Sequence, residues 1–160
     1  MDKLLVHGNG TLQGSINISG SKNASLPILA ATLLSGEPSI IRRVPDVSDT
    51  NYMLQILRAL GSEVERSSGT VRVEPADISP EAPYDLVRKM RASICVMGPL
   101  LARVGRATIS LPGGCVIGDR PVDLHIKAME GLGAQVEMEG GDIILSSPDG
   151  LVGAEIDMRG

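Results

Sequence analysis

Along this chain, stretches in which apolar residues recur every three to four positions alternate with stretches in which they recur every second position. A helical spacing of three to four residues gives way to the two-residue alternation of strands, first over residues 23–74 and again over 84–146. The first stretch predicts, in chain order, a helix over 23–34, a strand over 39–41, a helix that Asp49 caps and Gly61 ends, and a hairpin of strands over 63–66 and 70–74.

The second stretch predicts the same kinds of element in the same order. They are a helix from Tyr84 or Asp85 to Arg103 with a kink at Gly98 and Pro99, a strand over 107–111, a helix over 121–131, and a hairpin of strands over 134–138 and 142–146. Residues 75–83, which contain three prolines, form the predicted linker. Strands are also expected over 4–7 and 14–18, and the start of another over 154–158.

The two stretches are copies of one unit. Residues 59–73 return 72 residues later, where Ala-Leu-Gly-Ser-Glu-Val-Glu becomes Gly-Leu-Gly-Ala-Gln-Val-Glu. Residues 36–40 return only 69 residues later, so the second copy carries three extra residues between its strand and its next helix. These fall in the stretch that contains Gly113, Gly114 and Cys115. An insertion in one copy of a repeat usually maps to a surface loop, often the functional one.

Composition narrows the function classes. The chain has 160 residues, room for one domain with a real core, which must be built without Trp or Phe. Fifteen basic residues against nineteen acidic ones give a net charge of −4, which argues against a nucleic-acid surface but not against a small anionic ligand. No long apolar segment predicts a signal peptide or membrane span, and the two cysteines are not expected to pair. A reducing cytoplasm fits both observations.

A cysteine within a glycine-rich loop is the strongest chemical signal. Residues 111–120 read Leu-Pro-Gly-Gly-Cys-Val-Ile-Gly-Asp-Arg, with Cys115 among glycines and Arg120 five residues on. Glycines allow a ligand to approach the backbone, and a nearby positive charge favours the reactive thiolate. The alternative is an incidental cysteine in a tight strand-to-helix turn. Cys95, in an apolar helical run, is predicted to be a small core residue.

Two helix starts could also hold an anionic ligand. Lys22 and Asn23 open the first helix, where free amides favour anions; the alternative is an ordinary N-cap with a solvated lysine. Arg88, Lys89 and Arg91 occupy the matching place in the second copy, where either a ligand phosphate or a solvated, carboxylate-paired face would explain them.

Other candidates carry weaker signals. Asp123, after Arg120, could contact a ligand or simply be an acid that the helix dipole favours. His7 and His125 are too isolated for a metal pair, and no metal-ligand cluster, Walker loop or dinucleotide fingerprint is present in the sequence.

Three motifs carry a family resemblance. They are Ser-Lys-Asn-Ala-Ser-Leu-Pro-Ile-Leu-Ala-Ala from Ser21, Met-Arg-Ala-Ser from Met90, and Leu-Pro-Gly-Gly-Cys-Val-Ile-Gly-Asp-Arg-Pro-Val-Asp-Leu-His from Leu111. Together they resemble the UDP-N-acetylglucosamine 1-carboxyvinyltransferases (UDP-GlcNAc enolpyruvyl transferases) over essentially the whole chain. The related EPSP synthases share the fold and the lysine but not Ser-Lys-Asn-Ala or the Pro-Gly-Gly-Cys loop.

The resemblance implies a fold and a reaction. The fold is α/β, an inside-out α/β barrel with two similar domains of three repeated units each. The reaction transfers enolpyruvate from phosphoenolpyruvate to the 3-hydroxyl of UDP-GlcNAc and releases phosphate, as the first committed step of peptidoglycan synthesis. It implies these two substrates and no cofactor or metal.

The resemblance also assigns roles by motif match. Cys115 would be the general acid that protonates the methylene carbon of phosphoenolpyruvate, and could form a covalent adduct with it. Lys22 and Arg120 would bind the phosphate and carboxylate, and Asn23 the reacting sugar. The nucleotide would be held by Arg91 and by the run Arg120, Pro121, Val122, Asp123 and Leu124.

Length is where the sequence departs from the family, whose members run to roughly 400 residues. We expect an N-terminal fragment in which residues 1–19 pair with an absent second domain and residues 20–160 hold two of three units, about 20–75 and 84–148. The acid that would deprotonate the sugar and a further phosphate-binding arginine would lie in the missing part, which could be a partner. A nucleotide-binding module without turnover and a bare structural fragment are the alternatives.

Overall fold

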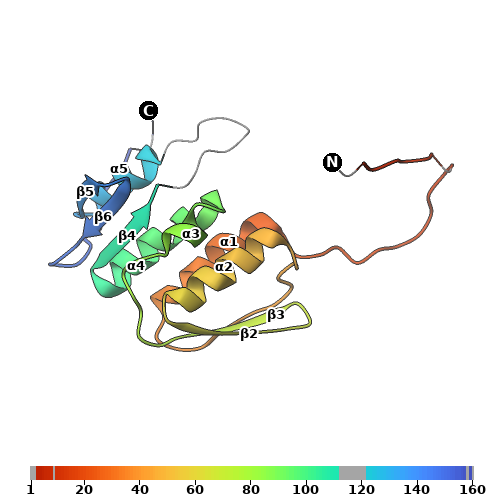
Figure 1. Cartoon of the computed structure of the whole chain (residues 1–160), viewed down its shortest axis with the longest axis horizontal. Helices are drawn as coiled ribbons and strands as arrows, with labels where there is room; N and C mark the ends of the chain where they lie inside the picture. The colour runs from red at the N-terminus through yellow and green to blue at the C-terminus, as the bar shows by residue number, and fades with distance from the viewer. Residues whose placement is uncertain (1–2, 9, 112–121, 158, 160) are drawn as a thin grey trace.

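The protein is described by a computed structural model that covers residues 3–8, 10–111, 122–157 and 159. Short helices and strands alternate along it (Figure 1). In chain order they are α1 (Lys22–Ala31), the 3₁₀ turn η1 (Thr32–Leu34), β1 (Ser39–Ile41), α2 (Ser48–Ala59), β2 (Ser62–Ser67), β3 (Thr70–Pro75), α3 (Tyr84–Val87), the 3₁₀ segment η2 (Arg91–Val96), α4 (Met97–Val104), β4 (Arg106–Ser110), α5 (Asp123–Gly131), β5 (Gln135–Glu139) and β6 (Asp142–Ser146).

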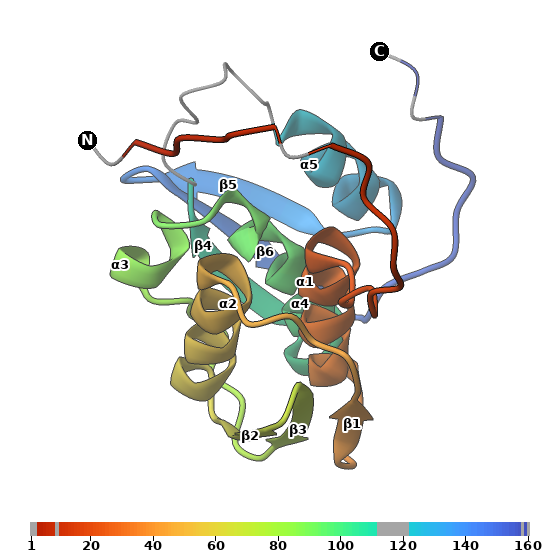
Figure 2. The same ribbon diagram turned by 90° about the vertical axis from the view of Figure 1, so that its right-hand side faces the viewer.

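The strands form two antiparallel sheets with the same order. β3 lies between β1 and β2 in the first sheet, and β6 lies between β4 and β5 in the second. Figure 2 shows α1, α2 and α4 between the two sheets. The central strands turn Val71, Val73, Ile143 and Leu145 into this layer, and all four side chains are fully buried. Both sheets therefore bury one face against a shared layer of helices, as their two-residue alternation predicts.

The repeat is present in the structure, with one correction to its register. Ile41 pairs with Val71, and the equivalent pair in the second sheet is Ile109 with Ile143. The central strands are thus 72 residues apart, but the first strands are 68 apart rather than the predicted 69. The excess between β4 and α5 is therefore four residues, not three. A short strand carries too few side chains for sequence matching to fix its register, which is set by which isoleucine faces the core.

The predicted helix from Tyr84 to Arg103 is broken earlier than expected. It divides into α3, η2 and α4, with the first break at residues 88–90 and a change from 3₁₀ to α-helical geometry at Met97. Gly98 and Pro99 instead lie in the first turn of α4. Amides of a first turn have no partner within the helix, so a proline is accepted there.

The linker makes strand contacts that the sequence does not predict. Glu81 and Thr108 form a parallel bridge, in which Thr108 N donates to Pro80 O at 2.8 Å and Ala82 N donates to Thr108 O at 3.1 Å. The linker therefore covers the outer edge of β4, and its extended form follows from its prolines.

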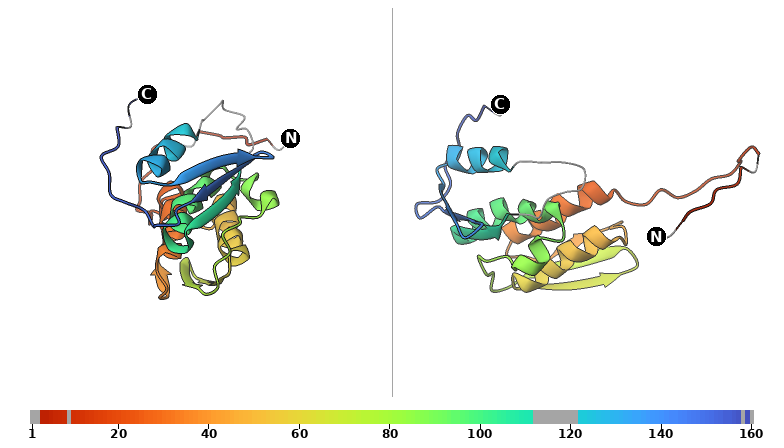
Figure 3. Two further views of the ribbon diagram at one scale, coloured as in Figure 1. Left: turned by 90° about the vertical axis from the view of Figure 1, so that its left-hand side faces the viewer. Right: turned by 45° about the horizontal axis from the view of Figure 1, so that its top comes forward.

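The expected outer strands are not formed. The described residues among 3–20 and 154–157 contain no strand, so the predictions over 4–7, 14–18 and 154–158 are wrong for the described residues of this structure. Figures 1 and 3 show the N-terminal arm leading away from the body. Leu4 and Leu12 are more than nine-tenths exposed, because no other described segment pairs with the arm. That residues 1–19 pair with a second domain stays a prediction.

No described helix is long and apolar enough to cross a membrane.

The two units are joined directly, because Arg103 of α4 donates to the carbonyls of Leu33 and Ser35 in the first unit. Such bonds satisfy carbonyls at the end of η1, which a helix terminus leaves without a partner.

The repeat provides a matched stability test at two equivalent glycines. Gly61 and Gly133 both follow a helix with positive φ, of 102° and 92°. A Cβ on Gly61 would overlap the carbonyl of Asp77, whereas a Cβ on Gly133 would meet nothing within 4 Å. We expect Gly133→Ala to cost about 1 kcal/mol from backbone strain alone, and Gly61→Ala about 3 kcal/mol because the linker must also move. Urea unfolding measures both, and equal costs would contradict this account.

Candidate functional site

The starts of four helical segments surround one hollow of about 500 Å³. Lys22 and Asn23 come from the first turn of α1, Asp49 from the first turn of α2, and Arg91 from the first residue of η2. His125 enters from α5. Helix starts present free amides, so this convergence favours an anionic ligand. The structure thus brings together Lys22, Asn23 and Arg91, three residues to which the family motifs assign roles.

Lys22 is held in place by a carboxylate. Its Nζ donates to Asp49 Oδ2 at 2.6 Å, across the adjacent helices α1 and α2. The two side chains remain 45% and 31% exposed, so the pair adds little to stability. What it does is fix the ammonium at the wall of the hollow. The sequence interpretation of Asp49 as an N-cap missed this contact.

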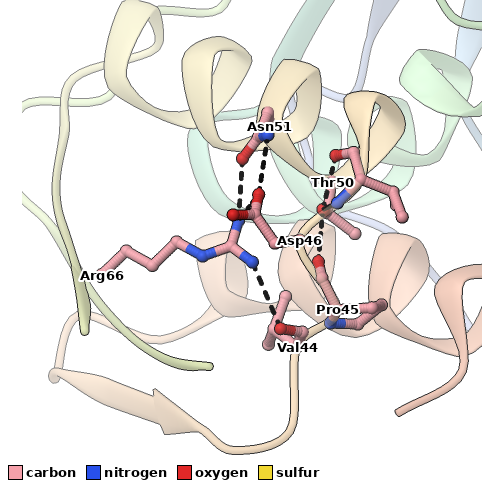
Figure 4. Close-up of polar contacts among 7 residues, drawn as sticks. Val44, Pro45, Asp46, Thr50, Asn51 and Arg66 are labelled. Carbon is pink, nitrogen blue, oxygen red and sulfur yellow. Dashed lines mark hydrogen bonds and ion pairs between the residues drawn. The ribbon is translucent and has the colours of Figure 1, made fainter. Parts of the chain in front are cut away.

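The cap of α2 is different from the predicted one. Val47 is the N-cap residue of α2, and Asp49 lies within the first turn, where the helix dipole favours an acid. Thr50 closes the start instead, because its hydroxyl accepts from Val47 N at 3.3 Å and donates to Pro45 O at 2.7 Å (Figure 4).

A polar network anchors the same helix start to the first hairpin. Figure 4 shows Arg66 of β2 reaching Asn51 and the loop before α2. Arg66 donates to Asn51 Oδ1 at 2.7 Å and to Val44 O at 3.3 Å, and its guanidinium lies 3.4 Å from Asp46 Oδ1. Asn51 also donates to Asp46 at 3.0 Å. The network fixes the turn that delivers Asp49 to the hollow.

Charge in the hollow is mainly positive. Lys22, Lys89 and Arg91 line it together with one carboxylate, Asp49. Cations near helix starts oppose the helix dipole, so their gathering here suits the phosphate or carboxylate groups of a ligand. Arg88 leaves the predicted cluster, because it pairs with Asp85 at 3.6 Å. The carboxylate-paired alternative therefore fits Arg88.

Cys95 is half-buried and lines the hollow, so the prediction of a core cysteine holds only in part. It packs against the core, and burial raises the pKa of its thiol. His125, set aside as isolated, also lines the hollow. Among the described residues, no group of three or more His, Cys, Asp or Glu side chains could hold a metal ion.

The remaining predicted residues are placed as follows. Val122 packs half-buried against the core, Asp123 opens α5, and Leu124 is 40% exposed. The predictions for Cys115, Arg120 and Pro121 lie outside the described residues.

Comparison with known proteins identifies the family of the chain. The family model for EPSP synthase (3-phosphoshikimate 1-carboxyvinyltransferase) matches residues 6–160. A UDP-N-acetylglucosamine 1-carboxyvinyltransferase from Akkermansia muciniphila is 66% identical over 160 residues, and one from Methylacidiphilum infernorum is 54% identical over the same length. In both cases the match covers 100% of this chain and 38% of the relative.

A solved structure shows the same fold. The enolpyruvyl transferase NikO from Streptomyces tendae superposes with a TM-score of 0.75 at 25% identity, covering 91% of this chain and 32% of that one. The chain therefore belongs to the EPSP synthase family of enolpyruvyl transferases, and the predicted α/β fold class is confirmed. It spans 38% of the length of the two curated relatives.

The two cysteines should differ in reactivity. Because burial raises the pKa of Cys95, little of it is thiolate at neutral pH. The glycines beside Cys115 and Arg120 five residues on predict a thiol that is easier to reach and that ionises more readily. We expect iodoacetamide or a fosfomycin-like epoxide to label Cys115 first, as mass mapping of the peptides would show. In Cys115→Ser only slow labelling should remain. Faster labelling of Cys95 in the folded chain would contradict the assignment.

Proposed function

We propose that this chain provides one wall of the active site of a UDP-GlcNAc enolpyruvyl transferase. The observation that carries the proposal is the convergence of Lys22, Asn23 and Arg91 at one hollow of positive charge. Two ligands that bear phosphate, phosphoenolpyruvate and UDP-GlcNAc, suit such a hollow. The 66% identity over the whole chain to a protein of that name supports the choice of reaction.

The proposed reaction moves a carboxyvinyl group in two steps. The thiol of Cys115 gives its proton to the methylene carbon of phosphoenolpyruvate, while the 3-hydroxyl oxygen of the sugar bonds to the neighbouring carbon and loses its proton to a base. The adduct then releases phosphate and a proton from the new methyl group, which restores the double bond. Lys22 and Arg120 bind the phosphate and carboxylate, and fixed cations stabilise the charge that develops.

The nucleotide side of the proposal rests on other residues. Asn23 contacts the reacting sugar, Arg91 holds the nucleotide, and residues 120–124 complete its site. We place this activity in the reducing cytoplasm, as a step of peptidoglycan synthesis on which cell-wall growth, cell shape and division depend. The alternative is a module that binds the nucleotide without turnover.

Binding tests the assigned residues. We expect UDP-GlcNAc to shift backbone NMR resonances of Asn23 and Arg91, and Arg91→Ala to weaken its dissociation constant about tenfold through loss of a charge-assisted hydrogen bond. Arg58→Ala, on α2 with its guanidinium bonded to Val64 O outside the hollow, is the matched control. Shifts that avoid the hollow would refute the proposal.

Turnover separates the enzyme from the binding module. The transition state needs groups placed on both sides of the substrates, including a base for the sugar hydroxyl. We expect no measurable phosphate release from phosphoenolpyruvate and UDP-GlcNAc by the 160-residue chain alone, and release once the remaining part of a relative is added. Turnover by the purified 160-residue chain would show that it does not need the remaining part of a relative. Binding without turnover after that part is added would favour the binding module.

A further inference from the structure

Lys89 is a cation of the hollow to which the family motifs assign no role. It lies in the turn between α3 and η2, where Lys89 N donates to Leu86 O at 3.2 Å and Met90 N donates to Val87 O at 3.3 Å. Its Nζ lies 5.6 Å from the centre of the Tyr52 ring, and its side chain lines the hollow. Within the described part of the chain, no carboxylate pairs with it.

The neighbouring cation behaves differently. Arg88 lies over Tyr84 at 5.5 Å and pairs with Asp85 at 3.6 Å, and Tyr84 is 59% exposed. Arg88 therefore makes its contacts with Asp85 and Tyr84 at the surface, whereas Lys89 lines the hollow beside Arg91. The turn between α3 and η2 is what separates two adjacent cations in this way.

Tyr52 is a fixed platform. It is half-buried on α2 and packs against the core, so the face that it offers to Lys89 has a defined position. Tyr52 lies three residues after Asp49, on the same side of the helix. One face of α2 therefore holds two cations from neighbouring segments, Lys22 by a carboxylate and Lys89 by an aromatic ring.

We propose that Lys89, positioned by Tyr52, is a further ligand-binding residue of the hollow and contacts the diphosphate of the sugar nucleotide beside Arg91. This rests on the proposed function, which gives the hollow its ligand. The cations divide into two groups, Lys22 on α1 and the pair Lys89 and Arg91 two residues apart in the second unit. A diphosphate carries charge on two adjacent groups and matches the pair, whereas the single phosphate of phosphoenolpyruvate goes to Lys22.

The test compares two lysines. Lys89→Gln removes a charge from the hollow, and Lys127→Gln removes one from α5, where the ammonium contacts Arg159 O. Dissociation constants for UDP-GlcNAc and phosphoenolpyruvate are measured by titration calorimetry at two salt concentrations. We expect Lys89→Gln to weaken UDP-GlcNAc about five- to tenfold, with a smaller salt dependence and less than about twofold change for phosphoenolpyruvate, and Lys127→Gln to match the wild type.

Tyr52 variants test the platform. Tyr52→Leu removes the ring and should reproduce part of the loss, Tyr52→Phe keeps the ring and should restore the affinity, and Tyr52→Leu combined with Lys89→Gln should be no weaker than Lys89→Gln alone. Additive losses would overturn the positioning role of Tyr52.

The outcomes for Lys89 are distinct from those of the proposed function. Tight UDP-GlcNAc binding that Arg91→Ala weakens and Lys89→Gln does not would overturn this inference alone. An equal loss in Lys127→Gln would overturn it too, since only net charge would then matter. If the wild-type chain does not bind UDP-GlcNAc, the proposed function fails for this chain and the inference fails with it.

Discussion

Burial of one face of each sheet against a shared layer of helices is the constraint on which the rest of this structure depends. The central strands carry fully buried Val71, Val73, Ile143 and Leu145. The helices pack leucine and methionine side chains into the same core, because the chain has no Trp or Phe. Since the two units repeat the same order of elements, their helices start at the same end of the layer. The hollow is the consequence, because α1, α2 and η2 each deliver their first residues to it.

The positive side chains that line the hollow lie near helix starts, where the helix dipole disfavours them. Cations at helix starts are disfavoured by the dipole and by each other, and the structure offsets this with two different partners on α2. Asp49 pairs with Lys22 at 2.6 Å and neutralises its charge. The Tyr52 ring, whose centre is 5.6 Å from Lys89 Nζ, contacts that ammonium without neutralising it. The network of Arg66, Asn51 and Asp46 holds the start of α2 in place. These contacts set the positions of the lysine side chains that line the hollow.

Half-burial of Cys95 shows why residue type alone is a poor guide to position. An apolar helical run correctly indicated that Cys95 contacts the core, but its 3₁₀ segment turns it partly toward the hollow. The raised pKa of its thiol follows from burial and keeps little of it in the reactive thiolate form. Asp49 was missed as a residue of the hollow, although the sequence placed it, like Lys22, at the start of a helix in the first unit.

The sequence by itself determined the repeat, the hairpins and the family, because each depends on short-range patterns. Alternation and turn residues fix β2 with β3 and β5 with β6 locally, and the motifs around Lys22 and Arg91 are contiguous. Only the tertiary structure decided the break at residues 88–90, the register of β1 and β4, and which of Arg88, Lys89 and Arg91 face the hollow. These depend on contacts between segments tens of residues apart, and the energy of such contacts is not encoded in the spacing of residues along one element.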